Sequence, residues 1–300
     1  MTTGSIPRTL HALLHTLIDY AGLFPPAGLD MGAVVRNYAL YRRERHAWML
    51  GRLVVPVSRL EELLAAMNAA GVAADAHAWR ISALAGDDFA GDVARTNAFN
   101  ARGAQARVDA LEVKAPSAAA IRAVAAATPP GLRVYAEIPV GDDPRALVAV
   151  VAETKLRAKI RTGGVSAEAI PAPEAVARFV RACYASGAGF KATAGLHHPL
   201  RAMQPLTYEA GAPRSVMHGF LNVFLTAVFH HNGMTIADAN ALMHRGAIDD
   251  VLFSDDHVTW REYRVSHDEL TTIRRRFAIS FGSCSFREPV DDLIKAGLLS

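Results

Sequence analysis

The chain has 300 residues, of which 51% are hydrophobic and 20% are charged. This balance excludes a generally disordered protein. The formal net charge is only +3, and basic residues are not grouped with aromatic ones, which argues against nucleic-acid binding. Two cysteines cannot build a disulfide framework, and the longest apolar run, 219–229, is too short to span a membrane. We therefore expect a cytoplasmic protein that acts on a small anionic metabolite.

Short apolar segments alternate with amphipathic ones along most of the chain. The first two helices are expected at 9–20 and 31–45, so that residues 1–50 form an N-terminal helical cap. Six strands are expected next, at 52–57, 79–85, 108–114, 133–139, 156–161 and 189–194. The helices expected between them are 59–70, 89–102, 118–127, 144–154 and 173–186. This alternation is typical of a parallel sheet covered by helices.

The alternation of expected strands and helices is less regular after residue 200. Helices expected at 215–231 and 236–245 make residues 200–250 a helical insertion after the sixth strand. A seventh strand fits either 251–254 or 260–265, and the sequence does not choose between them. An eighth strand at 278–283 precedes a closing helix at 289–298. Eight strands, with no glycine-rich dinucleotide fingerprint after the first, predict an α/β fold: one domain, 1–300, forming a (β/α)8 barrel of the TIM type.

The sixth expected strand carries an unusual lysine. Lys191 alternates with small apolar residues in GFKATAG, so that Lys191 and Thr193 share one face of the strand. Burial disfavours the charged form of an amine and lowers its pKa. The expected consequence is a neutral amine at Lys191 that can act as a nucleophile near neutral pH.

Charged side chains occupy alternate positions on the neighbouring strands as well. Glu112 lies near the end of the third expected strand, Glu137 on the fourth, and Lys159 and Arg161 on the fifth. A barrel layer that is only structural prefers branched aliphatic residues at such positions. In a barrel these strand ends meet at one mouth, so we expect the four side chains to gather around Lys191.

Three ordered segments resemble the deoxyribose-phosphate aldolase family of class I aldolases: VDALEV at 108–113, AKIRT at 158–162 and SGAGFKATAG at 186–195. They cover roughly the middle third of the chain. The resemblance implies that Lys191 forms the imine and that Glu112 takes the place of an aspartate that moves protons. The chain departs from that family after Gly195, where the family's further lysine in a Lys-x-Ser-Gly-Gly context has no counterpart.

The residues themselves are consistent with an aldolase-like lyase. Lys191, assisted by Lys159 or Arg161, would attack a carbonyl as a Schiff-base nucleophile, and Glu112 or Glu137 would move protons. No cofactor is needed for this chemistry. The substrate would be a small anionic aldehyde or ketone, with candidate binding residues Arg161, Thr162, Gly163, Gly164, Thr193, His197, His198 and Ser283.

Two other functions stay open from the sequence. His197 and His198, together with His218 and the barrel carboxylates, could hold Zn or Mn in a metal-dependent hydrolase or isomerase. A barrel that binds a ligand without catalysis is the second alternative, and its apolar helices would also permit a homo-oligomer. Cys284, in FGSCSF, is expected to be a buried small residue rather than a nucleophile.

Overall fold

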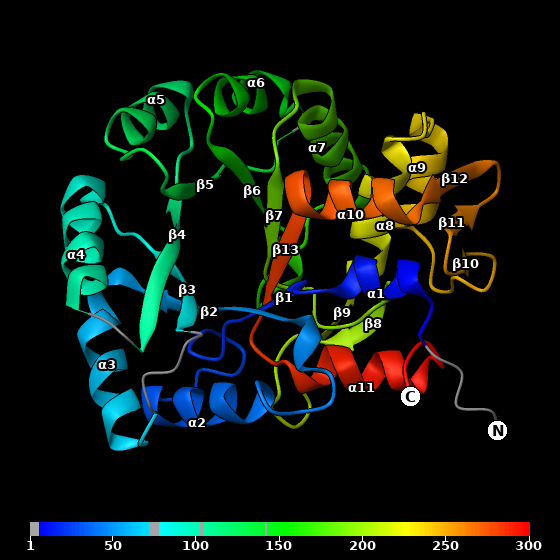
Figure 1. Cartoon of the computed structure of the whole chain (residues 1–300). Helices are drawn as coiled ribbons and strands as arrows, with labels where there is room; N and C mark the ends of the chain where they lie inside the picture. Colours follow the sequence, from blue (N-terminus) through cyan, green and yellow to red (C-terminus); the bar gives the residue numbers. More distant parts are fainter. Residues whose placement is uncertain (1–5, 73–77, 103–104, 142) are drawn as a thin grey trace.

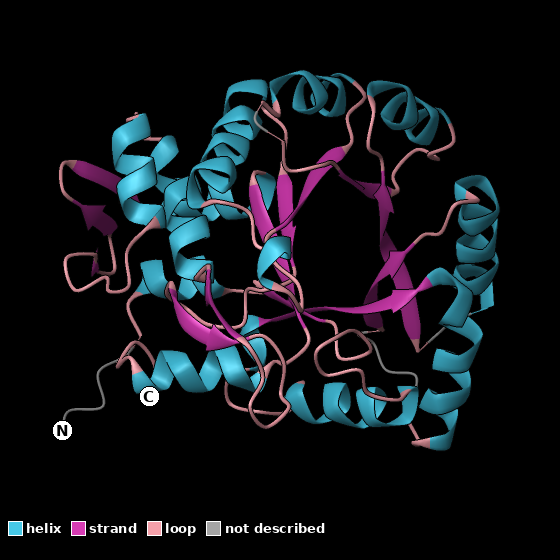
Figure 2. Cartoon of the chain, turned by 180° about the vertical axis from the view of Figure 1, so that it is seen from behind, coloured by secondary structure: helices cyan, strands magenta, loops and turns pink. Residues whose placement is uncertain are grey.

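Eight parallel strands close into a barrel in the computed structural model, which describes residues 6–72, 78–102, 105–141 and 143–300. The order around the barrel is β1-β13-β7-β6-β5-β4-β3-β2. Figure 2 shows these strands enclosed by helices. The strands are β1 (Ile18–Tyr20), β2 (Leu50–Pro56), β3 (Trp79–Leu84), β4 (Ala106–Lys114), β5 (Arg133–Glu137), β6 (Arg157–Arg161), β7 (Phe190–Thr193) and β13 (Ala278–Ser283). The predicted TIM-type (β/α)8 barrel is confirmed.

The strand that closes the barrel is β1, where the sequence predicts the end of a helix. The helix α1 (Arg8–Leu14) stops at His15, and Thr16 adopts a positive φ of 50° that turns the chain into β1. Ile18 then pairs with Leu50 of β2 on one side and with Phe281 of β13 on the other. The helix expected at 9–20 is therefore wrong over 15–20. A three-residue strand is too short to show an alternating pattern, which explains the error.

Helices connect the strands and cover the barrel (Figure 1). Those that follow β1 to β6 are α2 (Met31–Tyr41), α3 (Leu60–Ala69), α4 (Phe89–Arg102), α5 (Ala118–Ala126), α6 (Arg145–Glu153) and α7 (Pro173–Ser186). The boundaries of α7 follow from two residues. Pro173 occupies the first turn, where its missing N–H costs nothing, and Gly187 ends the helix with a φ of 69°. That glycine directs the chain into β7, which carries Lys191.

The insertion after β7 is not purely helical. It begins with an antiparallel pair of strands, β8 (Ala202–Pro205) and β9 (Arg214–Met217), and continues with α8 (Phe220–His230) and α9 (Ile236–Met243). The helix expected from 215 starts five residues later because the preceding residues pair as β9. Every residue of α8 is buried, as expected for a helix that is apolar on all sides.

Both candidates for the seventh strand lie outside the barrel. They belong to a separate antiparallel sheet of β10 (Leu252–Phe253), β11 (His257–Trp260) and β12 (Tyr263–Ser266). This sheet lies beside α9 at the edge of the molecule (Figure 1). The chain re-enters the barrel through α10 (His267–Arg276) and ends in α11 (Arg287–Lys295). None of the helices in the described part of the chain has the length and apolarity that a membrane crossing requires.

Candidate active site

Lys191 lies inside the barrel, with 1% of its surface exposed. Its ammonium donates to Oδ2 of Asp19 at 2.6 Å and to Oε1 of Glu112 at 2.5 Å. The two carboxylates come from β1 and β4, on either side of β7 around the barrel. A buried charge needs such partners, because burial alone is costly. Lys191 is thus held between two carboxylates from different parts of the chain.

A second lysine continues this arrangement. Lys159 of β6 is in register with Lys191 of β7, and its ammonium lies 2.8 Å from Oε2 of Glu112 and 2.8 Å from Oε2 of Glu137. Arg161 lies 3.5 Å from Glu137 on the other side. Charges therefore alternate along an ion-pair chain formed by Asp19, Lys191, Glu112, Lys159, Glu137 and Arg161. The structure brings together all four predicted catalytic residues.

The charge state of Lys191 differs from the sequence-based expectation. Burial by itself would lower the pKa of Lys191, but the attraction of Asp19 and Glu112 outweighs it and the pKa is raised. The pKa of Glu112 is lowered, because Lys159 and Lys191 overcome the effect of burial on that carboxyl. The expectation of a neutral amine in the free protein is wrong. It considered only desolvation and the neighbouring cations, and it missed Asp19.

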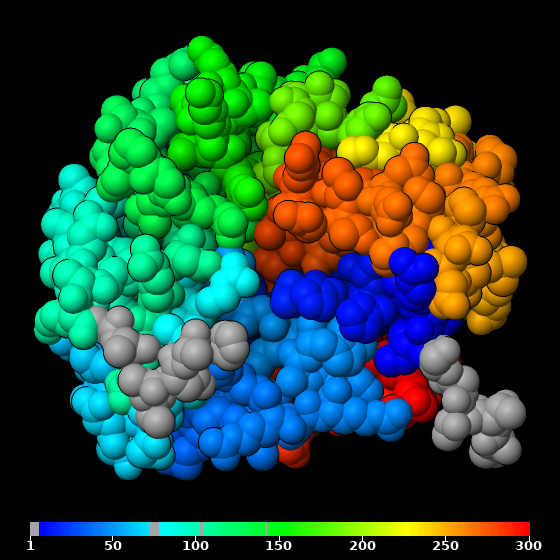
Figure 3. All heavy atoms as spheres, in the orientation of Figure 1, coloured from blue at the N-terminus to red at the C-terminus, as the bar shows by residue number. Residues whose placement is uncertain are grey.

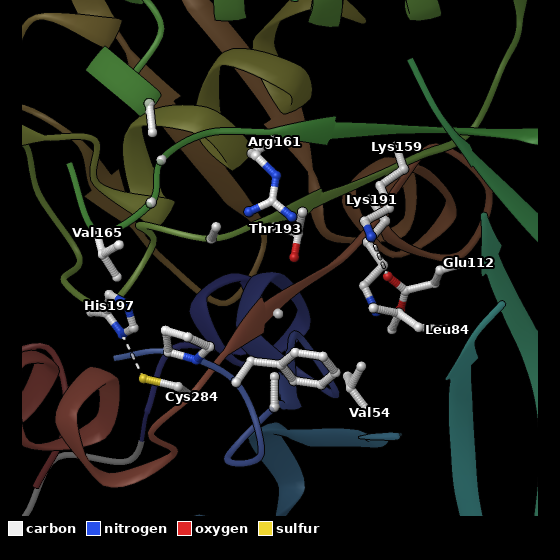
Figure 4. Close-up of a pocket in the computed structure, with 18 of the residues that line it drawn as sticks. Val54, Leu84, Glu112, Lys159, Arg161, Val165, Lys191, Thr193, His197 and Cys284 are labelled. Carbon is white, nitrogen blue, oxygen red and sulfur yellow. Dashed lines mark hydrogen bonds and ion pairs between the residues drawn. The ribbon is translucent and has the colours of Figure 1, made fainter. Parts of the chain in front are cut away.

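A cavity of about 390 Å³ opens beside Lys191. Figure 4 shows the Lys191–Glu112 pair at one end of it, and His197 with Cys284 at the other. Arg161 and Thr193 lie along the wall between the two ends. Phe24 and Pro25, from the loop after β1, contribute apolar surface, as do Val54 and Leu84. The cavity is large enough for a small metabolite and offers both charged and apolar contacts.

Two of the predicted binding residues, Thr162 and Gly163, hold the loop after β6 against the loop after β7. Gly163 and Gly195 approach so closely that a Cβ added to Gly163 would lie 2.9 Å from the Gly195 Cα. Thr162 is buried, and its hydroxyl donates to the carbonyl oxygen of Ala194 at 2.6 Å. The loops after β6 and β7 are thereby fastened together. Thr162 supports the wall, whereas Gly163, Gly164, Arg161 and Thr193 line the cavity.

The histidines separate into different environments. His197 lines the cavity, with Nδ1 3.3 Å from Oγ of Ser283 and 3.8 Å from Sγ of Cys284. Burial, followed by the charge of His198, lowers the pKa of His197 to about 4, so its ring is neutral. His198 instead pairs with Asp292 at 2.6 Å. Cys284 and His197 lie 87 residues apart along the chain, so no local sequence pattern indicates that they are neighbours.

The three candidate metal ligands do not form one site. Nε2 of His218 donates to the carbonyl oxygen of Pro171 at 2.8 Å, and the ring centroids of His197 and His198 are 6.5 Å apart. In the described part of the chain, no group of three or more His, Cys, Asp or Glu side chains is arranged to hold a metal ion. The metal-dependent alternative gains no support from this arrangement.

Three residues of the site were not predicted. Asp19 binds Lys191, Ser280 donates to Asp19 Oδ2 at 2.8 Å, and Ser82 donates to Glu112 Oε1 at 2.6 Å. The aspartate did leave a signal, since Asp19 is the one charged residue in the apolar run LIDYAGLF. No sequence pattern singles out Ser280 or Ser82, because serine is common on strands that face polar groups.

Comparison with protein-family models, with curated proteins and with solved structures gave no match to this chain.

Proposed function

We propose that this protein is a lyase of the class I aldolase kind, which forms a Schiff base between Lys191 and a small anionic aldehyde or ketone. The observation that carries the proposal is the buried Lys191 ammonium, paired with two carboxylates and exposed to a cavity of about 390 Å³. A lysine with only a structural role would not need an open cavity beside its nitrogen. The resemblance of three strand segments to deoxyribose-phosphate aldolases points to the same chemistry.

The raised pKa of Lys191 requires that the ammonium lose a proton before it attacks. Glu112 is the nearest base, and its carboxylate already accepts a hydrogen bond from the ammonium at 2.5 Å. Transfer of one proton to Glu112 leaves a neutral amine and a neutral acid. Both groups are at most 2% exposed, so the proton moves directly between them without passing through bulk solvent.

The chemical steps then balance as follows. The amine nitrogen of Lys191 bonds to the carbonyl carbon, and the π-electron pair of the carbonyl moves to its oxygen, which receives the proton from Glu112 and a second proton from the nitrogen. The oxygen, which now carries both protons, leaves as water, and the electron pair that remains on the nitrogen forms the C=N bond of the iminium ion. A carboxylate such as Glu137 takes the proton of a hydroxyl on the β-carbon of the substrate, and the electron pair of the Cα–Cβ bond moves towards the iminium as that bond breaks. The β-carbon fragment leaves as an aldehyde, and an enamine stays on Lys191. Hydrolysis of the iminium formed after reprotonation releases the product and restores Lys191.

Arg161 is suited to bind the anionic end of the substrate. Its side chain is 49% exposed and lines the cavity, and among the described residues its one carboxylate contact is with Glu137, at the long distance of 3.5 Å. A guanidinium can bind a phosphate or carboxylate through two parallel hydrogen bonds. This assigns Arg161 a role in substrate binding and leaves the proton transfers to Glu112 and Glu137.

Reductive trapping tests the proposal. The protein is incubated with glyceraldehyde 3-phosphate, acetaldehyde and pyruvate in turn, reduced with borohydride, and examined by intact mass and peptide mapping. We expect one adduct, on Lys191, that is absent from the Lys191→Met variant and present in a Lys155→Met variant, whose exposed lysine lies outside the cavity. Failure of every substrate to leave an adduct on Lys191 would overturn the proposal. Bound metal is measured in parallel.

A further inference from the structure

A second cavity, of about 650 Å³, lies at the end of the barrel where the strands begin. Arg133 and Arg157 are the first residues of β5 and β6, and Arg80 is the second residue of β3. The helices α1 and α10 form the opposite wall. Figure 3 shows the blue α1 and the orange α10 side by side on this face, next to the cyan and green segments of the barrel. This cavity is distinct from the one beside Lys191 and shares no lining residue with it.

The charges around this second cavity are not balanced. Six arginines and three histidines line it, and no acidic residue does: the lining arginines are Arg52, Arg80, Arg133, Arg157, Arg274 and Arg275. Asp109 pairs with two of them, Arg52 at 2.5 Å and Arg80 at 2.8 Å. For the other four arginines, no ion pair is found within the described residues.

The role of Arg274 differs from that of the other lining arginines. Its guanidinium is buried and donates to the carbonyl oxygens of Leu13 at 2.7 Å and Ile279 at 2.7 Å, which ties α10 to α1 and to β13. Arg133 and Arg157 have no such task, because neither donates a recorded side-chain hydrogen bond within the described part of the chain. The Arg157 guanidinium lies 5.9 Å from the centre of the Tyr135 ring, a contact with the ring face that uses none of its N–H donors. The N–H donors of both arginines are therefore available for a ligand.

Two further observations concern the balance of charge at this end of the barrel, where Asp109 is the acidic partner of only two lining arginines. Burial lowers the pKa of Arg133, and the nearby charges of Arg52 and Arg157 lower it further. The hydroxyl of Tyr135 is buried without a hydrogen-bond partner among the described residues, and it interacts electrostatically with Arg52 and Arg133. A concentration of like charges in a concave site attracts and retains anions.

We propose that this second cavity binds a small anion with two or more negative charges, a phosphate ester or a polycarboxylate, and that Arg133 and Arg157 hold it. Guanidinium groups fit both chemistries, because their paired N–H donors match two oxygens of either group. Bound anion would replace the missing acidic partners and stabilise the folded chain in proportion to its concentration. This site is independent of the chemistry proposed at Lys191.

Isothermal titration calorimetry at low salt tests this site, with inorganic pyrophosphate and citrate as the two probes. We expect saturable binding of at least one probe to the wild-type chain with one site per chain. The double variant Arg133→Gln/Arg157→Gln should bind at least about 100-fold more weakly, since each lost charge-assisted hydrogen bond costs about tenfold or more in affinity. A preference for pyrophosphate indicates a phosphate ester, and a preference for citrate indicates a polycarboxylate.

Two control variants separate this site from the rest of the surface. Arg161→Gln alters the cavity beside Lys191, and Arg122→Gln alters an exposed arginine that pairs with Glu153 on the outer helices. Arg122→Gln should bind the probe as the wild type does, and Arg161→Gln should keep the binding that the double variant loses. Absence of saturable binding to the wild-type chain would overturn the proposal, and so would loss of binding in Arg161→Gln with retention in the double variant. If the double variant does not fold, Arg157→Lys takes its place, with a loss of about 10-fold expected because the charge stays and the paired donors are lost.

Discussion

The ammonium of Lys191 lies 2.6 Å from Oδ2 of Asp19, although 172 residues separate the two in the sequence. The contact reaches across β13, which lies between β1 and β7 in the barrel. Asp19 is itself fixed on both oxygens: Oδ1 accepts the backbone N–H of Arg52 at 2.6 Å, and Oδ2 accepts the hydroxyl of Ser280 at 2.8 Å. Closure of the barrel by β1 thus completes the environment of Lys191.

Replacing Asp19 tests the importance of this contact. Asp19→Asn preserves size and an acceptor for the Arg52 backbone but removes one of the two negative partners of Lys191. We expect the free energy of unfolding to fall by about 3 kcal/mol, since breaking a buried ion pair leaves an uncompensated charge. The pKa of Lys191 should also fall, so that reductive trapping reaches half its maximum at a lower pH than in the wild type. Urea unfolding and a pH series of trapping measure the two effects.

The control for this variant is Asp143→Asn. Asp143 pairs with Arg145 at 2.7 Å on the exposed surface. Exposed pairs contribute little, so its free energy of unfolding should stay within about 1 kcal/mol of the wild type. An equal loss of stability in both variants would show that the buried Asp19–Lys191 pair stabilises the protein no more than an exposed ion pair does.

Glu112 and Glu137 should differ in their effects when each is replaced by glutamine. Glu112 is 2% exposed and accepts from Lys191, Lys159 and Ser82, whereas Glu137 is less buried. We therefore expect Glu112→Gln to lower the free energy of unfolding by about 3 to 5 kcal/mol and Glu137→Gln by about 1 to 2 kcal/mol. Parallel urea titrations measure this difference. The reverse order would contradict the ion-pair chain as described.

Much of this site could be predicted because strand residues alternate between two faces. That rule predicts that Lys191, Glu112, Lys159 and Glu137 point towards the inside of the barrel. It could not place Asp19, because β1 has three residues and no detectable period. It also could not exclude β10 and β12 from the barrel, since an apolar strand looks the same in the sequence whether it joins a barrel or a small outer sheet.

The pKa of Lys191 shows a second limit of sequence reasoning. Burial and like charges lower the pKa of an amine, and opposite charges raise it, so the net direction depends on distances. Glu112 and Asp19 lie within hydrogen-bonding distance of Lys191, whereas the expectation weighed only the nearby Lys159 and Arg161. No pattern in the sequence reports such distances between strands that are far apart along the chain.

The buried histidine His230 should make the protein sensitive to mild acid. It ends α8, its Nε2 has no hydrogen-bond partner among the described residues, and burial lowers its pKa from 6.5 to about 4. The unfolded chain therefore binds a proton at this position at pH values where the folded chain does not. Stability is lost as the pH falls from about 6.5 towards about 4, and this one group contributes up to about 3 kcal/mol.

Urea unfolding at several pH values measures this effect in the wild type and in His230→Phe. The variant should lose less stability between pH 6 and 5, by up to about 1.4 kcal/mol, because it lacks one titrating group. His244→Gln serves as the control, since His244 is exposed and pairs with Glu174. Identical pH dependence in the wild type and His230→Phe would contradict the assignment of a neutral, buried ring.

The contact between Gly163 and Gly195 makes the wall of the cavity intolerant of even one methyl group. In Gly163→Ala the new Cβ would lie 2.9 Å from the Gly195 Cα, so the backbone of one of the two loops must move. We expect a loss of about 1 to 3 kcal/mol in the free energy of unfolding, together with weaker trapping at Lys191, because these loops shape the cavity. Gly141→Ala is the matched control, since no atom lies within 4 Å of an added Cβ there. Thermal unfolding of both variants measures the difference. Equal midpoint temperatures in the two variants would contradict the prediction, because they would show that the loops move apart without loss of stability.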